Sequence, residues 1–333
     1  MTEAPRAVIF GCAGHQLSMA EQALLRDADP FGAILFTRNL DQPDQIRALC
    51  NDWRQTLGRD IPILIDQEGG RVQRLTPPLW RGFLPPLDVG LASPDPARAF
   101  WLRGRLIALE LRALGIDVNC APVADLARPE THAVLRNRCM GVDPAQVAAN
   151  ARAYADGLLA GGVIPVLKHI PGHGRATLDS HLALPRVQTP RAALEATDFA
   201  TFRALADLPM GMTAHLLFER IDPDRPATQS PVMLDLIRQG IGFDGLLMTD
   251  DISMQALAGS VAERAQAALA AGCDLVLHCN GDLAEMRVLA DSCPPMTDTA
   301  CMRAARALAL RHMPAPIDAG ALDAEHAGLM PKL

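Results

Sequence analysis

IPVLKH (Ile164–His169) joins a short apolar run directly to a lysine and a histidine. Short apolar runs rich in Val, Ile and Leu recur seven more times, and segments with a helical pattern separate them. These runs are Ala7–Phe10, Ala33–Phe36, Ile63–Ile65, Ile116–Asn119, Met210–Ala214, Leu246–Met248 and Asp274–His278. Their hydrophobicity is continuous rather than alternating, which is typical of parallel strands covered on both faces.

Eight such strands alternating with helices predict an α/β fold, a single-domain (β/α)8 barrel of the TIM type. A doubly wound open sheet is the competing architecture, but it has no need of eight repeats. No linker divides the chain, so we expect the barrel to cover residues 1–312. The Pro- and Ala-rich residues 313–333 predict a C-terminal tail.

Helix starts and stops are also marked in the sequence. Three capping side chains each precede a proline suited to the first helical turn, at Asp143-Pro144, Thr189-Pro190 and Ser230-Pro231. Gly161 and Gly240 predict two helix ends.

Composition restricts the class of protein. Of the 333 residues, 49% are hydrophobic and 21% charged, as in a soluble globular protein with a substantial core. The formal charge of −7 argues against non-specific nucleic-acid binding, and no apolar run approaches the roughly 18 residues of a membrane span. MTEAPRAVIFGCAG at the start is not typical of a signal peptide. The eight cysteines are scattered without a CxxC pair, so we expect free thiols and a cytoplasmic protein.

Polar residues follow most of the predicted strands. In a (β/α)8 barrel the carboxyl ends of the strands face the active site, so we expect these side chains to share one rim. Any one of them could instead cap a helix or bond to a loop, but a convergence of acids, histidines and a lysine predicts an enzyme. The residues are Arg38, Asn39, Asp66, Asn119, Asp125, Lys168, His169, His215, Asp250, Asp251 and Asn280.

The segment KHIPGHGRATLDSH (Lys168–His181) holds three of the nine histidines and leaves two chemistries open. One is a glycosidase with a carboxylate nucleophile and a separate acid/base. The other is a metal hydrolase, in which His169, His173, His181, His215 and Asp250 would be the ligands. The charge of Lys168 disfavours a cation beside His169, and the glycines indicate a flexible loop. We therefore expect no metal and no cofactor.

Four motifs resemble glycoside hydrolase family 3, and more narrowly its single-domain bacterial β-N-acetylhexosaminidases that recycle peptidoglycan. The long KH…PGHG…DSH pattern is highly specific, whereas TDD alone would be weak. The resemblance runs from about Ala33 to Asn280. The motifs are LIDQEGGRVQRL (Leu64–Leu75), KHIPGHGRATLDSHLALP (Lys168–Pro185), MTAH (Met212–His215) and GLLMTDDISM (Gly245–Met254).

The resemblance implies a role for each matching residue. Asp250 corresponds to the nucleophile that forms a covalent glycosyl-enzyme, and His181 to an unusual acid/base with Asp179 as its charge partner. A histidine near neutrality can protonate a leaving oxygen and then activate water. The residues that correspond to the binding site of the terminal sugar are Asp66, Arg74, Arg138, Lys168 and His169.

Several neighbouring residues have open assignments. The run RNRCMG departs from the family pattern around Arg138, so Arg136 is the other candidate. We expect Arg71 to pair with Glu68 or to be exposed. Asp251 is expected to be structural and His173 to order its loop, whereas His215 could equally be a buried core histidine.

The implied activity is removal of a terminal N-acetylglucosamine from N-acetylglucosaminyl-1,6-anhydro-N-acetylmuramyl peptides. Aromatic residues make up only 4% of the chain, with a single tyrosine, which favours a pocket for one terminal sugar over a long cleft. A glycoside phosphorylase or a β-glucosidase of the same family is the alternative. A non-enzymatic carbohydrate-binding barrel would not need Asp250 together with Asp179 and His181. We expect a small carbohydrate substrate, with no nucleic acid, membrane or obligate protein partner.

Overall fold

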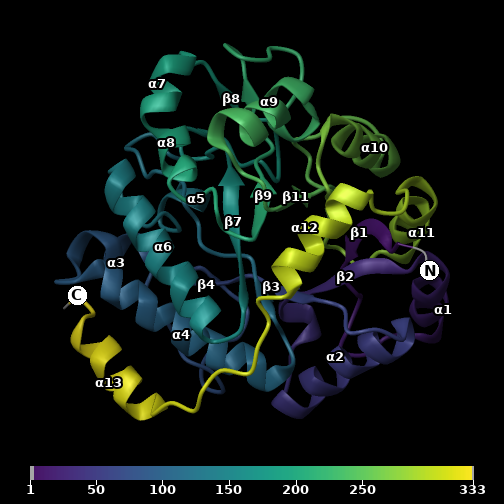
Figure 1. Cartoon of the computed structure of the whole chain (residues 1–333), viewed down its shortest axis with the longest axis horizontal. Helices are drawn as coiled ribbons and strands as arrows, with labels where there is room; N and C mark the ends of the chain where they lie inside the picture. The colour runs from purple at the N-terminus through teal and green to yellow at the C-terminus, as the bar shows by residue number, and fades with distance from the viewer. Residues whose placement is uncertain (1–3, 332–333) are drawn as a thin grey trace.

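The computed structural model describes residues 4–331, in which eight parallel strands close into a barrel surrounded by helices (Figure 1). The strands are neighbours in chain order around the circle, which confirms the (β/α)8 barrel and excludes a doubly wound sheet. The barrel strands are β1 (Arg6–Phe10), β2 (Pro30–Leu35), β3 (Ile63–Ile65), β6 (Val118–Asn119), β7 (Ile164–Ile170), β9 (Met210–Thr213), β11 (Leu246–Asp251) and β12 (Leu275–His278).

Both faces of the strands are buried, which is why their hydrophobicity is continuous. Residues such as Phe10 and Leu35 pack outward against the helices, and their neighbours Ile9 and Ile34 fill the barrel. The longer surrounding helices are α1 (Met19–Ala28), α2 (Pro43–Leu57), α4 (Pro96–Leu114), α6 (Pro144–Ala160), α10 (Val261–Ala271), α11 (Leu283–Ser292) and α12 (Asp298–Leu308). Helix α12 closes the amino-terminal end of the barrel with Ala300, Ala304 and Ala307.

Shorter helices complete the outer layer. They are α3 (Pro86–Ala92), α5 (Ala133–Arg136), α7 (Arg191–Ala196), α8 (Asp198–Arg203) and α9 (Pro231–Asp235), which continues into a π-helical turn over Leu236–Ile241. Two small accessory sheets lie outside the barrel, formed by β4 (Gln67–Gly69) with β5 (Val72–Gln73) and by β8 (Arg186–Val187) with β10 (Leu217–Phe218).

The predicted helix boundaries are partly right. Asp143 and Ser230 cap α6 and α9 through their side chains, and Gly161 follows the end of α6, as expected. Thr189 was the wrong cap, because α7 begins one residue later and Pro190 occupies the cap position without a side-chain hydrogen bond. Gly240 is also not the helix end, because the π-helical turn carries the chain on to Gly242, whose φ of 85° suits glycine.

The segment after His312, expected as a tail, contains helix α13 (Ala319–Gly328). Asp318 caps this helix, and α13 packs beside α4 (Figure 1). Arg81 pairs with Asp323 at 2.6 Å, and Arg98 pairs with Glu325 at 2.6 Å. The end of the chain is thus tied to the barrel, and the domain boundary at residue 312 stays a prediction.

All eight cysteines are free thiols, as the absence of a pairing pattern indicated. Within residues 4–331, the structure has no helix with both the length and the apolar character needed to span a bilayer.

Candidate active site

A cavity of about 420 Å³ opens at the carboxyl ends of the barrel strands, within the range typical of small-molecule sites. All eight residues predicted for the site line this one cavity. They come from strands β7 and β11, from the loop that follows β7, and from the segments just after β3, β5 and α5, which are far apart in sequence. The eight residues are Asp66, Arg74, Arg138, Lys168, His169, Asp179, His181 and Asp250.

Strand periodicity aims two of these side chains into the cavity. Strands β7 and β11 continue beyond the apolar runs to Ile170 and Asp251, so Lys168 and Asp250 lie within strands rather than in loops. Alternate residues of a strand share a face. Lys168 therefore follows Val166, and Asp250 follows Met248, on the face that fills the barrel.

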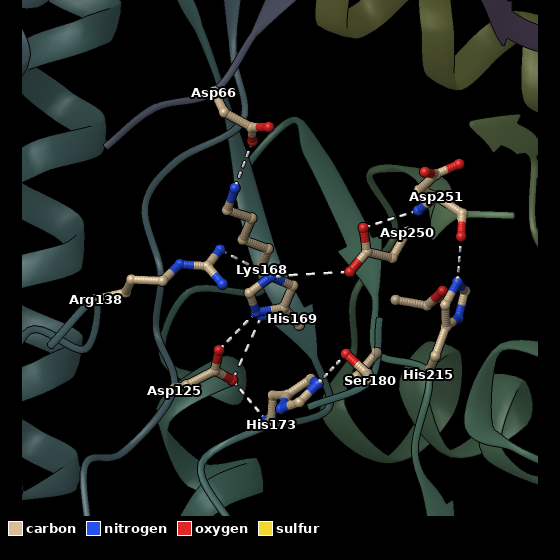
Figure 2. Close-up of polar contacts among 12 residues, drawn as sticks. Asp66, Asp125, Arg138, Lys168, His169, His173, Ser180, His215, Asp250 and Asp251 are labelled. Carbon is tan, nitrogen blue, oxygen red and sulfur yellow. Dashed lines mark hydrogen bonds and ion pairs between the residues drawn. The ribbon is translucent and has the colours of Figure 1, made fainter. Parts of the chain in front are cut away.

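Two carboxylates and three cations form a buried network on one wall of the cavity. The Lys168 ammonium lies 2.8 Å from Asp66 and 2.7 Å from Glu68 (Figure 2 shows the bond to Asp66). Arg138 binds both oxygens of Glu68, at 2.7 and 2.9 Å, and Arg74 donates to Asp66 at 3.0 Å. The network presents fixed charges suited to the hydroxyl and carbonyl groups of a sugar.

Mutual attraction keeps these groups ionised despite their burial. Burial alone would raise the pKa of Asp66, but the charges of Lys168 and Arg74 hold that pKa well below its ordinary value. Burial would likewise lower the pKa of Lys168, and the two carboxylates raise it instead. Burial opposes the low pKa of Glu68 as well, which Arg138 and Lys168 impose.

The two candidate arginines differ in position. Arg138 lines the cavity, whereas Arg136 is exposed at the end of α5 and does not line it. Arg71 was expected either to pair with Glu68 or to be exposed. It is exposed at the cavity, and Glu68 pairs with Arg138 and Lys168 instead. Glu68, which sequence reasoning considered only as a partner for Arg71, does not line the cavity, but both of its partners do. The feature of the sequence that could have indicated its role is its place two residues after Asp66, just beyond the end of β3.

Asp125 is a second residue whose role sequence reasoning missed. It is fully buried, and its carboxylate accepts the Nδ1 proton of His169 at 2.7 Å and the His173 amide proton at 2.6 Å (Figure 2). Burial would raise the pKa of Asp125, but the two histidines lower it. With Nδ1 protonated, His169 turns Nε2 toward Arg138 at 3.4 Å and Asp250 at 4.0 Å.

Asp250 stands across the cavity from this network. One oxygen accepts the Asp251 amide proton at 2.8 Å (Figure 2). Burial would raise the pKa of Asp250, but His169, His215 and this amide lower it, so the group is a carboxylate at neutral pH. An ionised carboxylate with a free oxygen can attack a carbon that carries positive charge.

The neighbours of Asp250 have structural contacts. Asp251 accepts hydrogen bonds from the amide and hydroxyl of Ser253 and from the Cys279 amide, as expected of a structural acid. His215 is fully buried, donates from Nε2 to the Asp251 carbonyl at 3.1 Å and faces the Thr228 hydroxyl with Nδ1 at 2.8 Å. Burial lowers the pKa of His215, so the ring is neutral and is satisfied as a core histidine.

The loop between β7 and β8 carries Asp179 and His181 to the mouth of the cavity. The Asp179 carboxylate accepts from His181 Nδ1 at 2.7 Å and from its amide at 3.0 Å. Burial opposes the low pKa of Asp179, which the hydrogen bonds from His181 produce. The acid thus fixes the orientation of the imidazole, whose other nitrogen is left to exchange a proton.

The donor set does not fit the metal hydrolase alternative. His215 is enclosed in hydrogen bonds, and His173 points to Ser180 rather than toward Asp250 (Figure 2). From Ala4 to Pro331, no three His, Cys, Asp or Glu side chains are placed to share a metal ion.

Known proteins resemble this chain over most of its length. The model of the glycosyl hydrolase family 3 N-terminal domain matches residues 8–301. A β-hexosaminidase from Alkalilimnicola ehrlichii is 41% identical over 82% of this chain and 80% of its own length. A β-hexosaminidase from Chromobacterium violaceum is 41% identical over 86% of this chain and 82% of its own length. The crystal structure of NagZ from Neisseria gonorrhoeae in complex with N-trifluoroacetyl-D-glucosamine has a TM-score of 0.87 and 31% identity, covering 98% of this chain and 99% of its own. These matches confirm the resemblance drawn from the four motifs, and the chain belongs to glycosyl hydrolase family 3.

Proposed function

We propose that this protein is a retaining exo-β-N-acetylhexosaminidase that releases one terminal N-acetylglucosamine. The observation that carries the proposal is that an ionised Asp250 and the Asp179–His181 pair line the same cavity. A nucleophilic carboxylate and a separate proton donor are the two groups that a double-displacement glycosidase requires. The β-hexosaminidase relatives and the NagZ complex with an N-acylated glucosamine agree with this substrate class.

In the first step, an oxygen of Asp250 attacks C1 of the sugar while the bond from C1 to the leaving oxygen breaks. His181 gives its proton to that oxygen, and Asp179 stabilises the imidazolium form before the transfer. In the second step, His181 takes a proton from water, and the water oxygen displaces Asp250 from C1. Two displacements at the same carbon return the β-anomer.

The buried charged wall supports the assignment of the terminal-sugar site. Asp66, Arg74, Arg138, Lys168 and His169 line the same cavity as Asp250, and Nε2 of His169 lies 4.0 Å from the Asp250 carboxylate. Groups that are already fixed by ion pairs lose little entropy when a sugar binds, so they can hold it in a reactive orientation.

The biological substrate we propose is the N-acetylglucosaminyl-1,6-anhydro-N-acetylmuramyl peptide of peptidoglycan turnover. Eight free cysteines agree with a reducing, cytoplasmic location, where such imported fragments would be met. One cavity of about 420 Å³ agrees with exo-cleavage and tolerance of the group that follows the first sugar.

Phosphorolysis is the second candidate, because the proposed acid/base is a histidine. The group that would activate the incoming nucleophile is then an imidazole and not a carboxylate, so phosphate could replace water in the second step. Incubation with and without phosphate separates the two reactions. Free N-acetylglucosamine in both samples supports hydrolysis, whereas a sugar 1-phosphate identifies a phosphorylase.

The test of the proposed function is trapping of the nucleophile. A fluorinated N-acetylglucosaminide with a good leaving group should add one sugar to the wild-type protein, and peptide mass spectrometry should find it on Asp250. Asp250→Asn should fold normally, lose almost all turnover and take no label. NMR should detect the β-anomer as the first product. A label on Asp251 or Glu68, or an α-anomer, would refute the proposal.

A further inference from the structure

The loop that carries His181 is held firmly at its base and loosely at its tip. At the base, the Ala176 carbonyl accepts the His132 amide proton at 2.9 Å, and Arg175 pairs with Asp198 at 2.8 Å. At the tip, the His181 side chain is 60% exposed and Leu182 is 75% exposed. The few contacts that the tip makes must therefore determine where the imidazole lies.

Ser180 is the inward-facing residue of this tip. It is only 5% exposed, and its hydroxyl oxygen lies 3.2 Å from Nε2 of His173 (Figure 2). Its carbonyl accepts the Ala256 amide proton at 3.2 Å, and the His181 carbonyl accepts that of Gln255 at 3.3 Å. Within the described residues 4–331, the contact with His173 is the one side-chain hydrogen bond that joins residues 177–185 to the rest of the protein.

The protonation of His173 determines the direction of that bond. Burial, followed by the neighbouring His169, lowers the pKa of His173 to about 4, so the ring is neutral at pH 7 with a single proton. Its Nδ1 is buried and has no partner among the described residues. An orphaned N–H is rarer than an unused acceptor in protein interiors, so the proton resides on Nε2 and is donated to Ser180.

On its other side, His173 is also fixed by contacts with Asp125 and His169, and His169 lines the cavity. The His173 amide donates to Asp125 at 2.6 Å, and its ring meets that of His169 edge-on, with centroids 5.4 Å apart. Asp125 in turn orients His169. His173 thus connects the wall that would bind the sugar with the loop tip that would protonate the leaving group (Figure 2).

We propose that Ser180 and His173 are positioning residues, whose hydrogen bond holds the loop tip so that His181 faces the leaving oxygen. The proposal rests on the proposed function, because it takes His181 as the acid/base. Ser180 lies between Asp179 and His181 in the chain, so any shift of Ser180 displaces both members of the pair. Misplacement of a reacting group by about 1 Å can lower a rate by as much as 100-fold.

The experiment compares two glycosides of N-acetylglucosamine, with 4-nitrophenol and with methanol as leaving groups. The value of kcat/KM reports the first step, and acid assistance matters much more for methanol. Ser180→Ala removes the acceptor with little change in volume. Thr177→Ala is the matched control, because it removes an exposed hydroxyl from the same loop. His173→Asn removes the ring nitrogen that faces Ser180, but it keeps the hydrogen bond from the backbone amide of residue 173 to Asp125.

Ser180→Ala should lower kcat/KM for the methyl glycoside about tenfold and leave the nitrophenyl glycoside within about twofold, in line with one lost hydrogen bond. Thr177→Ala should change neither value. In a variant that carries both Ser180→Ala and His173→Asn, the second change should lower the ratio of kcat/KM for the methyl glycoside to that for the nitrophenyl glycoside little further. Both changes break the same hydrogen bond, so their effects should not add. Equal losses on both substrates, no loss, or additive losses would overturn the proposal.

This result is separable from the proposed function. If wild-type protein cleaves the nitrophenyl glycoside but His181→Ala leaves the ratio unchanged, the acid/base assignment fails. If His181→Ala lowers the ratio and Ser180→Ala does not, only the positioning role fails.

Discussion

Replacement of Glu68 by glutamine tests the buried charge network directly. Glu68 is 2% exposed and accepts three short contacts, one from Lys168 at 2.7 Å and two from Arg138 at 2.7 and 2.9 Å. In Glu68→Gln, Lys168 keeps its bond to Asp66, but Arg138 loses its carboxylate partner. The variant therefore leaves the largely buried Arg138 guanidinium without a carboxylate partner.

The expected cost follows from the burial of the pair. Removal of one partner from a buried ion pair typically costs about 3–5 kcal/mol, and glutamine keeps the shape and one acceptor, so we expect about 3 kcal/mol. Because the unfolding entropy grows with chain length, at about 2.1 cal/mol/K per residue, that loss corresponds to a Tm lower by about 4 °C for 333 residues. Because Arg138 would lose its fixed orientation, KM for N-acetylglucosaminides should rise as well.

Urea unfolding followed by circular dichroism measures the loss, and Glu195→Gln is the matched control. Glu195 pairs with Arg191 at 2.7 Å on the surface, where both side chains are exposed, so its loss should cost less than about 0.5 kcal/mol. A Glu68→Gln protein as stable as the control, with unchanged KM, would refute the reasoning.

The pH dependence provides a second check with a defined sign. The pKa of Glu68 in the folded protein lies below its ordinary value of 4.5, so its contribution to stability is complete above that pH. The contribution is lost as the pH falls through the folded pKa. The stability difference between wild type and Glu68→Gln should therefore narrow below about pH 4.5, and a difference that widened there would contradict the ionised state of Glu68.

Further expectations concern catalysis, metals and the cell. His181→Ala should slow the methyl glycoside by about 10²–10⁴-fold and the nitrophenyl glycoside far less, with a smaller loss of the same kind in Asp179→Asn; equal losses would indicate a structural role for the loop. Dialysis against a strong chelator should leave activity unchanged, and loss followed by recovery with zinc would favour the metal hydrolase. Deletion of the gene should cause anhydro-disaccharide peptides to accumulate in cell extracts, as measured by mass spectrometry. No accumulation, combined with rapid cleavage of plain β-glucosides, would contradict the recycling role.

Local sequence was sufficient for the barrel and for the family. Strands covered on both faces need continuous apolar runs, and all eight predicted runs became barrel strands. The motifs that contain Asp66, Lys168 and Asp250 stand at the ends of those strands, so the topology of the fold places them at one rim. The residues predicted for the site therefore gathered in one cavity.

Other features depended on contacts between distant segments. Arg136 and Arg138 are two residues apart, and only the approach of Glu68, 70 residues away from Arg138 in the chain, distinguishes them. Asp125 gained its role because the segment after β6 runs beside β7 and brings the carboxylate to His169. A tail rich in proline and alanine became helix α13 on the barrel, where acids of the helix meet Arg81 and Arg98.

The difference has a physical reason. Hydrophobic periodicity and capping act within a few residues, so sequence alone determined the strands, two of the three predicted helix starts and the chemical groups available. The charge state and orientation of each group depend on which dipoles and ions surround it after folding, at distances of about 3 Å that no spacing in the chain encodes. Only the tertiary structure therefore decided which carboxylates are held between cations, which histidines are enclosed in the core, and which acid faces the open cavity.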